Sequence, residues 1–511
     1  MQPDRQTRWS APVRLVAVLC FGFFAVGLFG ILNHAMWRDE LNPWLIARDT
    51  ATLSDMLAAL HYEGHPVFWY LILRAVQALT LNPVAMQLLH LGIGTATVWL
   101  VVRFAPFRAW QKVLFAFGYL PFYEYLLVSR NYAIGLFLIV LVCVIFETRR
   151  RTYLPIAAIL VLMANASAFA LFVSTGFAIA LMFEYVRNVR AGIRPAVPVW
   201  NFLLSVILWI GGAALSLYFL VPPADSTLAG GAAGWYLQLD LNRLVLASIR
   251  IWSGYIAVLV PSDRGGAELG LLVVASLAMV VVFSTAFRRA PIVLVFYLVT
   301  TTIIIAFIYV KFLGGPRHYG HLYIVLVASW WLAQTADAAE IGAAVPAQAQ
   351  RRASALFTFL LALQSAAGIV AFARDMVVPM SAGRAAAAYI RVQGLDQLPM
   401  IGTSDHVMAT LAGYLGRRIY YPETGGMGSF VLFTADRRKV DDVLALEQTA
   451  QFAAAHDGTV LLILNRELKA SRSGLRITPV GQFTDRLMSD ELFYLYRATA
   501  GGSAAPVLPL P

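Results

Sequence analysis

The sequence predicts a polytopic α-helical membrane protein that carries a small soluble α/β domain towards its C-terminus. Of its 511 residues, 59% are hydrophobic and 13% are charged, whereas a soluble chain is about 25% charged. Long apolar runs recur up to residue 372, and charged residues and glycine turns follow them. We therefore expect a transmembrane domain over residues 1–372, an α/β domain over 373–500 and a disordered tail over 501–511.

The first apolar run, residues 13–33, is predicted to be a retained transmembrane helix. Its roughly 20 residues suffice to cross a bilayer and exceed the apolar core of a signal peptide. Arg5 and Arg8 precede the run, Arg14 lies at its start, and no clear small-x-small cleavage site follows it. Because basic residues favour the cytoplasmic side, we expect the N-terminus to lie inside.

The stretch from residue 34 to residue 83 is predicted to stay on the outer side of the membrane. The next long apolar run, 84–103, ends at Arg103 and therefore at the cytoplasmic face. The intervening apolar pieces, 53–61 and 66–80, are short for a span. We expect both to form amphipathic helices on the outer membrane face.

The remaining apolar runs alternate with arginine clusters and bring the predicted number of spans to eleven. The expected inner loops and N-terminus hold 16 lysines and arginines, against nine in the outer loops before the tail. This bias supports the orientation and places the C-terminus outside. A further amphipathic helix is expected at 240–260, in an outer loop. The predicted spans after the first are 84–103, 112–128, 131–147, 153–166, 168–186, 199–221, 268–287, 291–310, 319–336 and 353–372.

The tail combines helical and strand patterns, which predict the small α/β domain. Apolar residues recur with helical spacing over 405–415 and 441–455. Neither a G-x-G-x-x-G motif nor a P-loop is present in this part of the sequence. Short apolar runs predict four strands, at 398–402, 431–434, 460–464 and 492–496.

Charge and cysteine content exclude several classes of function. The net charge of +11 suits basic loops that face anionic membrane lipids, so we expect no nucleic-acid partner. Cys20 and Cys143 both lie within apolar runs, which indicates neither a disulfide framework nor a cysteine metal cluster. The H-x-E-x-H pattern at 61–65 is too weak to predict a metal site. We therefore predict no metal and no cofactor.

An adjacent acidic pair, Asp39 and Glu40, follows the first predicted span and lies between Trp37 and Trp44. Ionisable residues at a membrane boundary are costly unless they contact a site or water, so this pair is a candidate functional site. A positioned carboxylate can take the proton from an attacking hydroxyl group. The alternative is a solvated loop whose charges have no function.

A basic cluster follows the ninth predicted span and reads K-F-L-G-G-P-R-H over 311–318. Lys311 and Arg317, followed by His318, supply the positive charge that a leaving lipid phosphate requires. The Gly-Gly-Pro turn allows the backbone to approach a ligand closely. The alternative is that both basic side chains snorkel to the membrane interface.

Two outer loops add further candidate residues. Glu124 and Arg130 lie between the third and fourth predicted spans, where they form either a structural ion pair or a substrate contact. Tyr62, Glu63 and His65 lie in the first outer loop, where a sugar contact and a hydrogen-bonded structural role are the two alternatives.

Four motifs between residues 10 and 335 carry a family resemblance: W-R-D-E…A-R-D, E-G-H-P-V-F-W-Y-L, S-R-N-Y-A and G-P-R-H-Y. They resemble those of the GT-C glycosyltransferases, especially the protein O-mannosyltransferase-like and aminoarabinose-transferase-like families. The resemblance implies that Asp39 is the catalytic base, with Glu40 as its neighbour. Glu124 matches an acidic residue of the second outer loop only loosely. At His65-Pro66-Val67 the second proline of the family pattern is missing.

The resemblance implies an inverting glycosyltransferase of the bacterial inner membrane, with its active site and C-terminal domain in the periplasm. Its partners would be a polyprenyl-phosphate sugar donor and a lipid, glycan or protein acceptor. Lys311 and Arg317 would hold the phosphate, while Trp37, Tyr62 and His65 would shape access for the sugar or the lipid. Two alternatives remain open: a transporter or flippase of a lipid-linked saccharide, and a non-catalytic scaffold whose tail binds an envelope partner.

Overall fold

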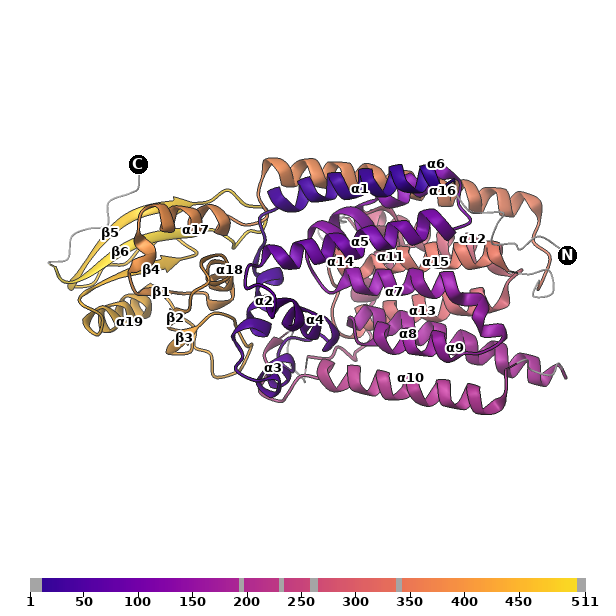
Figure 1. Ribbon diagram of the computed structural model, residues 1–511, viewed down its shortest axis with the longest axis horizontal. Helices are drawn as coiled ribbons and strands as arrows, with labels where there is room; N and C mark the ends of the chain where they lie inside the picture. Colours follow the sequence, from indigo (N-terminus) through magenta and orange to yellow (C-terminus); the bar gives the residue numbers. More distant parts are fainter. Residues whose placement is uncertain (1–11, 193–196, 229–233, 258–264, 337–341, 503–511) are drawn as a thin grey trace.

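The computed structural model describes residues 12–192, 197–228, 234–257, 265–336 and 342–502. A bundle of long helices forms most of the molecule, and a six-stranded sheet lies at one end of it (Figure 1). Among the described residues, eight helices are long and apolar enough to cross a membrane, which confirms the polytopic class. They are α1 (Val13–Asn33), α5 (Val84–Phe104), α7 (Tyr132–Ile145) with its continuation to Arg150, α9 (Ala168–Arg190), α10 (Val199–Leu220), α12 (Gly266–Phe287), α13 (Pro291–Val310) and α16 (Ala347–Val377).

Three of the eleven predicted spans form shorter helices, so that count is not confirmed. The runs 153–166 and 319–336 become α8 (Leu154–Ala164) and α15 (His321–Thr335). The run 112–128 is divided into α6 (Ala109–Ala116) and a π-helix, η2 (Tyr119–Leu127). The break lies at Phe117 and Gly118, where the chain leaves helical geometry.

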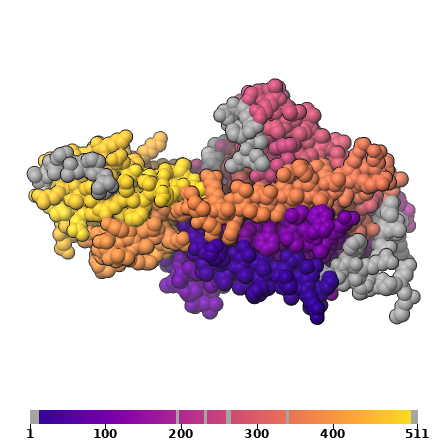
Figure 2. Space-filling view, turned by 90° about the horizontal axis from the view of Figure 1, so that it is seen from above, coloured from indigo at the N-terminus to yellow at the C-terminus, as the bar shows by residue number. Residues whose placement is uncertain are grey.

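The break between α6 and η2 packs closely against α16. Figure 2 shows α16, in orange, lying along α1 in indigo and the purple segment that follows α5. A Cβ atom on Gly368 of α16 would lie only 2.6 Å from the Phe117 carbonyl oxygen. A glycine is therefore required at this crossing, because any larger residue would push α16 away from the break.

Four further helices lie outside the eight candidate spans, and three of them fall where amphipathic helices were expected. Three of the four lie at the end of the bundle that faces the sheet, and the fourth, α11 (Leu241–Ile256), packs among the long helices (Figure 1). A helix does form within each of the ranges 53–61, 66–80 and 240–257, residues 258–260 of the third prediction lie outside the described residues, and the helix that carries the acidic pair was not anticipated. Their place on a membrane surface remains a prediction. They are α2 (Arg38–Asp49), α3 (Leu53–Leu60), α4 (Phe68–Gln77) and α11 (Leu241–Ile256).

The sheet has the strand order β3-β2-β1-β4-β6-β5, with β1 parallel to both β2 and β4 and the other pairs antiparallel. The predicted helices at 405–415 and 441–455 are both present. The domain boundary at residue 373 remains a prediction, and residues 503–511 of the expected tail lie outside the described residues. The elements are α17 (Gly383–Val392), β1 (Met400–Gly402), α18 (Asp405–Leu415), β2 (Ile419–Tyr421), β3 (Gly426–Gly428), α19 (Asp442–Ala454), β4 (Thr459–Leu464), β5 (Gly474–Phe483) and β6 (Phe493–Gly502).

The predicted strand at 431–434 is wrong. This segment belongs to no strand, and its partners lie outside the sheet. Thr434 forms an isolated bridge with Ser226, in the loop after α10, and Val431 N donates a hydrogen bond to Asn42 Oδ1 of α2 at 2.9 Å. The apolar residues of this segment therefore lie where the sheet domain packs against the helical domain.

The sheet domain packs directly on α2. Helix α18 lies against α2, and a Cβ on Gly413 would already touch the Leu41 side chain at 3.0 Å. Arg384 of α17 donates hydrogen bonds to the Leu32 and Asn33 carbonyl oxygens at the end of α1, at 3.1 and 2.7 Å. This contact binds carbonyl groups that the helix end leaves without partners. The acidic pair is thus enclosed between the two domains.

Candidate active site

Asp39 lies at the centre of a cluster of charged side chains that come from three separate segments. It is the second residue of α2, and its Oδ2 accepts hydrogen bonds from Arg130 Nη1 at 2.7 Å and from Arg317 Nη2 at 3.1 Å. Arg38 Nε lies 4.0 Å from the other carboxylate oxygen. The Asp39 side chain remains 24% exposed, so its carboxylate is open to solvent.

Arg130 is presented by the S-R-N-Y turn between η2 and α7, and buried hydrogen bonds fix that turn. Ser129 N donates to Glu40 Oε1 at 2.7 Å. His90 Nε2 lies 2.6 Å from the Arg130 carbonyl oxygen, and Asn131 Nδ2 donates to a backbone carbonyl before α9 at 2.9 Å. These contacts hold the backbone of Arg130, so its guanidinium group is pre-positioned for the carboxylate.

Arg317 comes from the short helix α14 (Pro316–Tyr319), between α13 and α15. Its carbonyl oxygen accepts a hydrogen bond from Tyr125 Oη at 2.8 Å, and its guanidinium group lies 5.7 Å from the centre of the Trp37 ring. Its Nε is buried and has no hydrogen-bond partner among the described residues. One donor of this arginine is therefore left without an acceptor in the described part of the chain.

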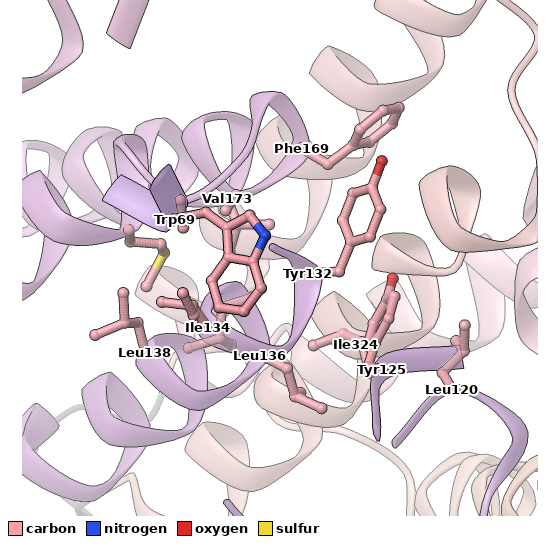
Figure 3. Packing of buried hydrophobic residues seen from close by; sticks show 14 of the residues in the cluster. Trp69, Leu120, Tyr125, Tyr132, Ile134, Leu136, Leu138, Phe169, Val173 and Ile324 are labelled. Atoms are coloured by element: carbon pink, nitrogen blue, oxygen red, sulfur yellow. The ribbon is translucent and has the colours of Figure 1, made fainter. Parts of the chain in front are cut away.

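Aromatic rings line the side of the cluster that faces the bundle. The Arg130 guanidinium group lies 5.4 Å from the centre of the Tyr132 ring, and Tyr132 stacks on Tyr125 at 5.8 Å. Figure 3 shows these two tyrosines together with Phe169, which packs against the His318 ring at 5.3 Å. Apolar surroundings strengthen the electrostatic contacts of the arginines, because they exclude water.

Glu63 and His65 extend the cluster on the side of α4. Gly64 between them has φ +64°, which glycine adopts readily, and this turn brings His65 Nδ1 to 2.6 Å from the Glu63 carbonyl oxygen. His65 Nε2 lies 3.2 Å from Arg130 Nη2 and therefore accepts a hydrogen bond from it. The Glu63 carboxyl group accepts hydrogen bonds from Asn42 at 3.0 Å and from Tyr70 at 3.1 Å.

These surroundings shift the pKa values of the cluster in opposite directions. Burial favours the neutral acid of Asp39, but the charges of Arg130 and Arg317 outweigh it and hold the pKa of Asp39 below its usual value. Burial raises the pKa of Glu63 to about 7, and burial together with the Arg130 charge lowers the pKa of His65 to about 4. Near neutral pH, two arginines thus face one ionised aspartate, and the cluster carries net positive charge.

Glu40 lies apart from this cluster, although it is the sequence neighbour of Asp39. Its side chain is fully buried, and its two oxygens accept hydrogen bonds from Ser129 N and Trp37 N. Glu40 Oε2 also lies 3.0 Å from His34 Nε2. Burial lowers the pKa of His34, but the carboxylates of Glu40 and Asp375 outweigh it and raise that pKa to about 10. The geometry of Glu40 is therefore that of a structural residue.

Arg130 does not form the ion pair with Glu124 that the sequence left open. Arg130 is paired with Asp39, and Glu124 Oε2 instead accepts a hydrogen bond from Tyr119 Oη at 2.7 Å within η2. His318, the neighbour of Arg317, packs among aromatic rings, and its Nδ1 accepts a hydrogen bond from Gly315 N at 2.9 Å.

Two other predicted residues point elsewhere. Tyr62 Oη donates hydrogen bonds to both oxygens of Asp225, at 3.1 and 3.0 Å. Lys311 Nζ lies 3.2 Å from the Gly234 carbonyl oxygen and 5.0 Å from the centre of the Trp235 ring. Lys311 therefore has the surroundings of an interfacial lysine, whereas Arg317 belongs to the cluster.

Asn42 and Tyr70, which hold Glu63, were not identified from the sequence. Asn42 lies one helical turn after Asp39 on α2, and Tyr70 belongs to the E-G-H-P-V-F-W-Y-L motif. Helical spacing from Asp39 would have indicated Asn42, had the acidic stretch been recognised as a helix.

In the described part of the chain, no group of three or more His, Cys, Asp or Glu side chains is arranged to hold a metal ion.

The long helices, the acidic residue on α2 and the sheet domain at the same end of the bundle make up a fold that a solved membrane protein shares. This fold is shared with the crystal structure of ArnT from Cupriavidus metallidurans bound to undecaprenyl phosphate. The match has a TM-score of 0.56 at 11% sequence identity, and it covers 97% of this chain and 100% of that one.

The expected likeness to GT-C proteins of the aminoarabinose-transferase type is thus confirmed at the level of the fold. The structural match extends well beyond residues 10–335, where the sequence motifs lie, and takes in the sheet domain. No family model matches the sequence, and no curated protein matches it.

Proposed function

We propose that this protein is an inverting glycosyltransferase that uses a polyprenyl-phosphate-linked sugar as its donor. The observation that carries the proposal is the Asp39 carboxylate, held by Arg130 and Arg317 at the end of a membrane bundle. The fold is that of ArnT, a protein that binds undecaprenyl phosphate. The acceptor is a lipid, a glycan or a protein that presents a hydroxyl group.

Asp39 is the general base in this proposal. Its lowered pKa keeps the carboxylate ionised at neutral pH, and it is partly exposed. The acceptor oxygen attacks the anomeric carbon, its proton passes to Asp39, and the bond from that carbon to the phosphate oxygen breaks. Attack opposite to the leaving phosphate inverts the anomeric centre.

Arg130 and Arg317 stabilise the phosphate that leaves. A guanidinium group contacts phosphate oxygens with two donors in a fixed geometry. As the phosphate draws the arginines to itself, their hold on Asp39 weakens and the aspartate becomes a stronger base. Trp37 and His65 border the same cluster and shape access for the sugar or the lipid. Glu63, Tyr62, Glu124, Lys311 and His318 are assigned no chemical step here.

The active site and the sheet domain face the periplasm, and the bundle spans the bacterial inner membrane, in this proposal. Residues 34–83 and the sheet domain lie at the same end of the bundle, as this orientation requires (Figure 1). The bias of arginine and lysine towards the expected inner loops supports the same direction.

The deciding experiment is mass spectrometry of envelope glycolipids and glycans from a deletion strain. We expect one sugar to be missing, to return with the wild-type gene and to stay missing with an Asp39→Asn gene of equal expression. The missing sugar would identify the donor, and the molecule that lacks it would identify the acceptor class. An unchanged set of glycolipids and glycans in the deletion strain would contradict the proposal.

A further inference from the structure

Helix α2 begins without a capping hydrogen bond from the side chain of its N-cap residue. Its N-cap residue is Trp37, whose side chain makes no capping hydrogen bond, although Asp39 stands in the first turn. The first backbone N–H groups of a helix have no partner within the helix, and an N-cap side chain usually binds one of them. In α2 the Glu40 carboxylate binds Trp37 N, and Arg38 N donates to Glu491 Oε1 at 3.2 Å.

Glu491 belongs to the sheet domain, two residues before the start of β6, and its carboxylate is fully buried. It accepts hydrogen bonds from Ser381 Oγ at 2.6 Å and from Thr410 Oγ1 at 2.9 Å. Arg38 Nη1 lies 3.3 Å from the same carboxylate. Glu491 is thus fixed by two segments of its own domain and reaches a helix of the other domain.

The neighbouring Asp490 binds the rest of Arg38. Its Oδ1 lies 2.8 Å from Arg38 Nη1, which leaves Arg38 Nε 4.0 Å from Asp39. Asp490 and Glu491 therefore draw the Arg38 guanidinium group to the sheet domain. Asp39 remains bound by Arg130 and Arg317, the two arginines assigned to the phosphate.

We propose that Glu491 is a positioning residue that caps α2 from the sheet domain and thereby fixes the direction of the Asp39 carboxylate. This inference rests on the proposed function. A negative charge at a helix N-terminus is favourable because it faces the positive end of the helix dipole. Without it, the first turn of α2 would loosen, and Asp39 is the second residue of that turn.

The test compares Glu491→Gln with Glu423→Gln in the full-length protein. Glu423 is the matched control, because it is a buried carboxylate of the same domain whose hydrogen bond runs to Ser404 N, within that domain. Hydrogen exchange of the peptide over residues 36–42 should speed up in Glu491→Gln and stay at the wild-type rate in the control. Turnover should fall about tenfold while polyprenyl-phosphate affinity stays unchanged, because only the position of the base is disturbed.

Asp490→Asn provides a second variant in case Glu491→Gln does not insert in the membrane, since Asp490 is 37% exposed. It should produce the same effects in a weaker form. Wild-type exchange in 36–42 in the folded Glu491 and Asp490 variants, or equal turnover in Glu491→Gln and Glu423→Gln, would overturn the inference. If wild-type protein transfers no sugar at all, the proposed function fails, and the exchange measurement still decides whether Glu491 caps α2.

Discussion

Asp39 Oδ2 and Arg317 Nη2 meet at 3.1 Å, although 278 residues separate them in the chain. The carboxylate thereby occupies a guanidinium group that, in the proposed reaction, must receive a phosphate. Base and leaving-group site are thus in direct contact. A change at either residue should alter both proton transfer and the binding of the donor lipid.

Replacing Asp39 by asparagine should separate these two effects. The variant keeps the size of the side chain but loses the base, so turnover should fall about a hundredfold or more. Polyprenyl-phosphate affinity should increase, because asparagine competes less for the arginines. Single-turnover assays and lipid binding measure the two quantities. Asp55→Asn, an exposed carboxylate of α3 bonded to Thr52, is the control and should behave as wild type. Near wild-type turnover in Asp39→Asn would refute the assignment.

Arg317→Ala should weaken polyprenyl-phosphate binding more than Arg317→Lys does, since lysine keeps the charge but lacks the two-donor geometry. The loss of one charge-assisted contact is worth about 1.5–3 kcal/mol, or about a 10- to 150-fold change in the dissociation constant. Lys311→Ala is the comparison, and its contacts with Trp235 and Gly234 lead us to expect a small effect. If Lys311→Ala weakens binding as much as Arg317→Ala, Lys311 also belongs to the phosphate site.

Glu40→Gln should reduce stability rather than remove the base. Both Glu40 oxygens accept buried hydrogen bonds, so the glutamine amide would set an N–H donor against another donor. The His34 imidazolium would also lose one of its two carboxylates. We expect the free energy of unfolding to fall by about 3–5 kcal/mol, seen as a lower melting temperature in detergent. An unchanged melting temperature would argue against this structural role.

The raised pKa of Glu63 predicts a pH dependence of stability. Its folded-state pKa is about 7, against an ordinary value of 4.5. The stability that the neutral carboxyl group contributes is complete below pH 4.5 and is lost as the pH rises through about 7. The wild-type melting temperature should therefore fall, over this range, relative to Glu63→Gln, which stays neutral. If the melting temperatures of wild type and Glu63→Gln change in parallel from pH 4.5 to about 8, Glu63 titrates normally.

Reporter fusions test the orientation of the chain. Alkaline phosphatase fused after Gly501 should be active, because it folds only in the periplasm, and a fusion near Arg150 should be inactive. A fluorescent protein that matures only in the cytoplasm should give the reverse result at both sites. The opposite pattern would place Asp39 in the cytoplasm and would end the argument for a periplasmic active site.

Much of the fold followed from local patterns in the sequence. Helix α18 was predicted at its observed limits, because apolar spacing and the glycine at 416 mark its course and its end. The strand prediction for 431–434 was wrong for a physical reason. Strand-like spacing shows that one face of a segment is buried, but it does not show which part of the protein covers that face. Its true partners, Ser226 and Asn42, lie in the helical domain.

The candidate site was predictable as a set of residues and not as a set of contacts. Asp39, Arg130 and Arg317 each stood out, yet Arg130 was considered with its near neighbour Glu124 and proved to bind Asp39, 91 residues away. Contacts between distant segments depend on how helices pack, which no local pattern records. The raised pKa of Glu63 is of the same kind, because burial by distant residues causes it.

The bond between Arg38 N and Glu491 spans 453 residues, and this separation bears on how the protein is made. At the usual rate of synthesis, roughly 20 to 90 seconds pass between the addition of one residue and the other. During that time α2 has left the ribosome without its contact to Glu491, and strand β6 has yet to be translated. A chain whose synthesis stops early would hold every arginine of the cluster and still lack the residue that secures the first turn of α2.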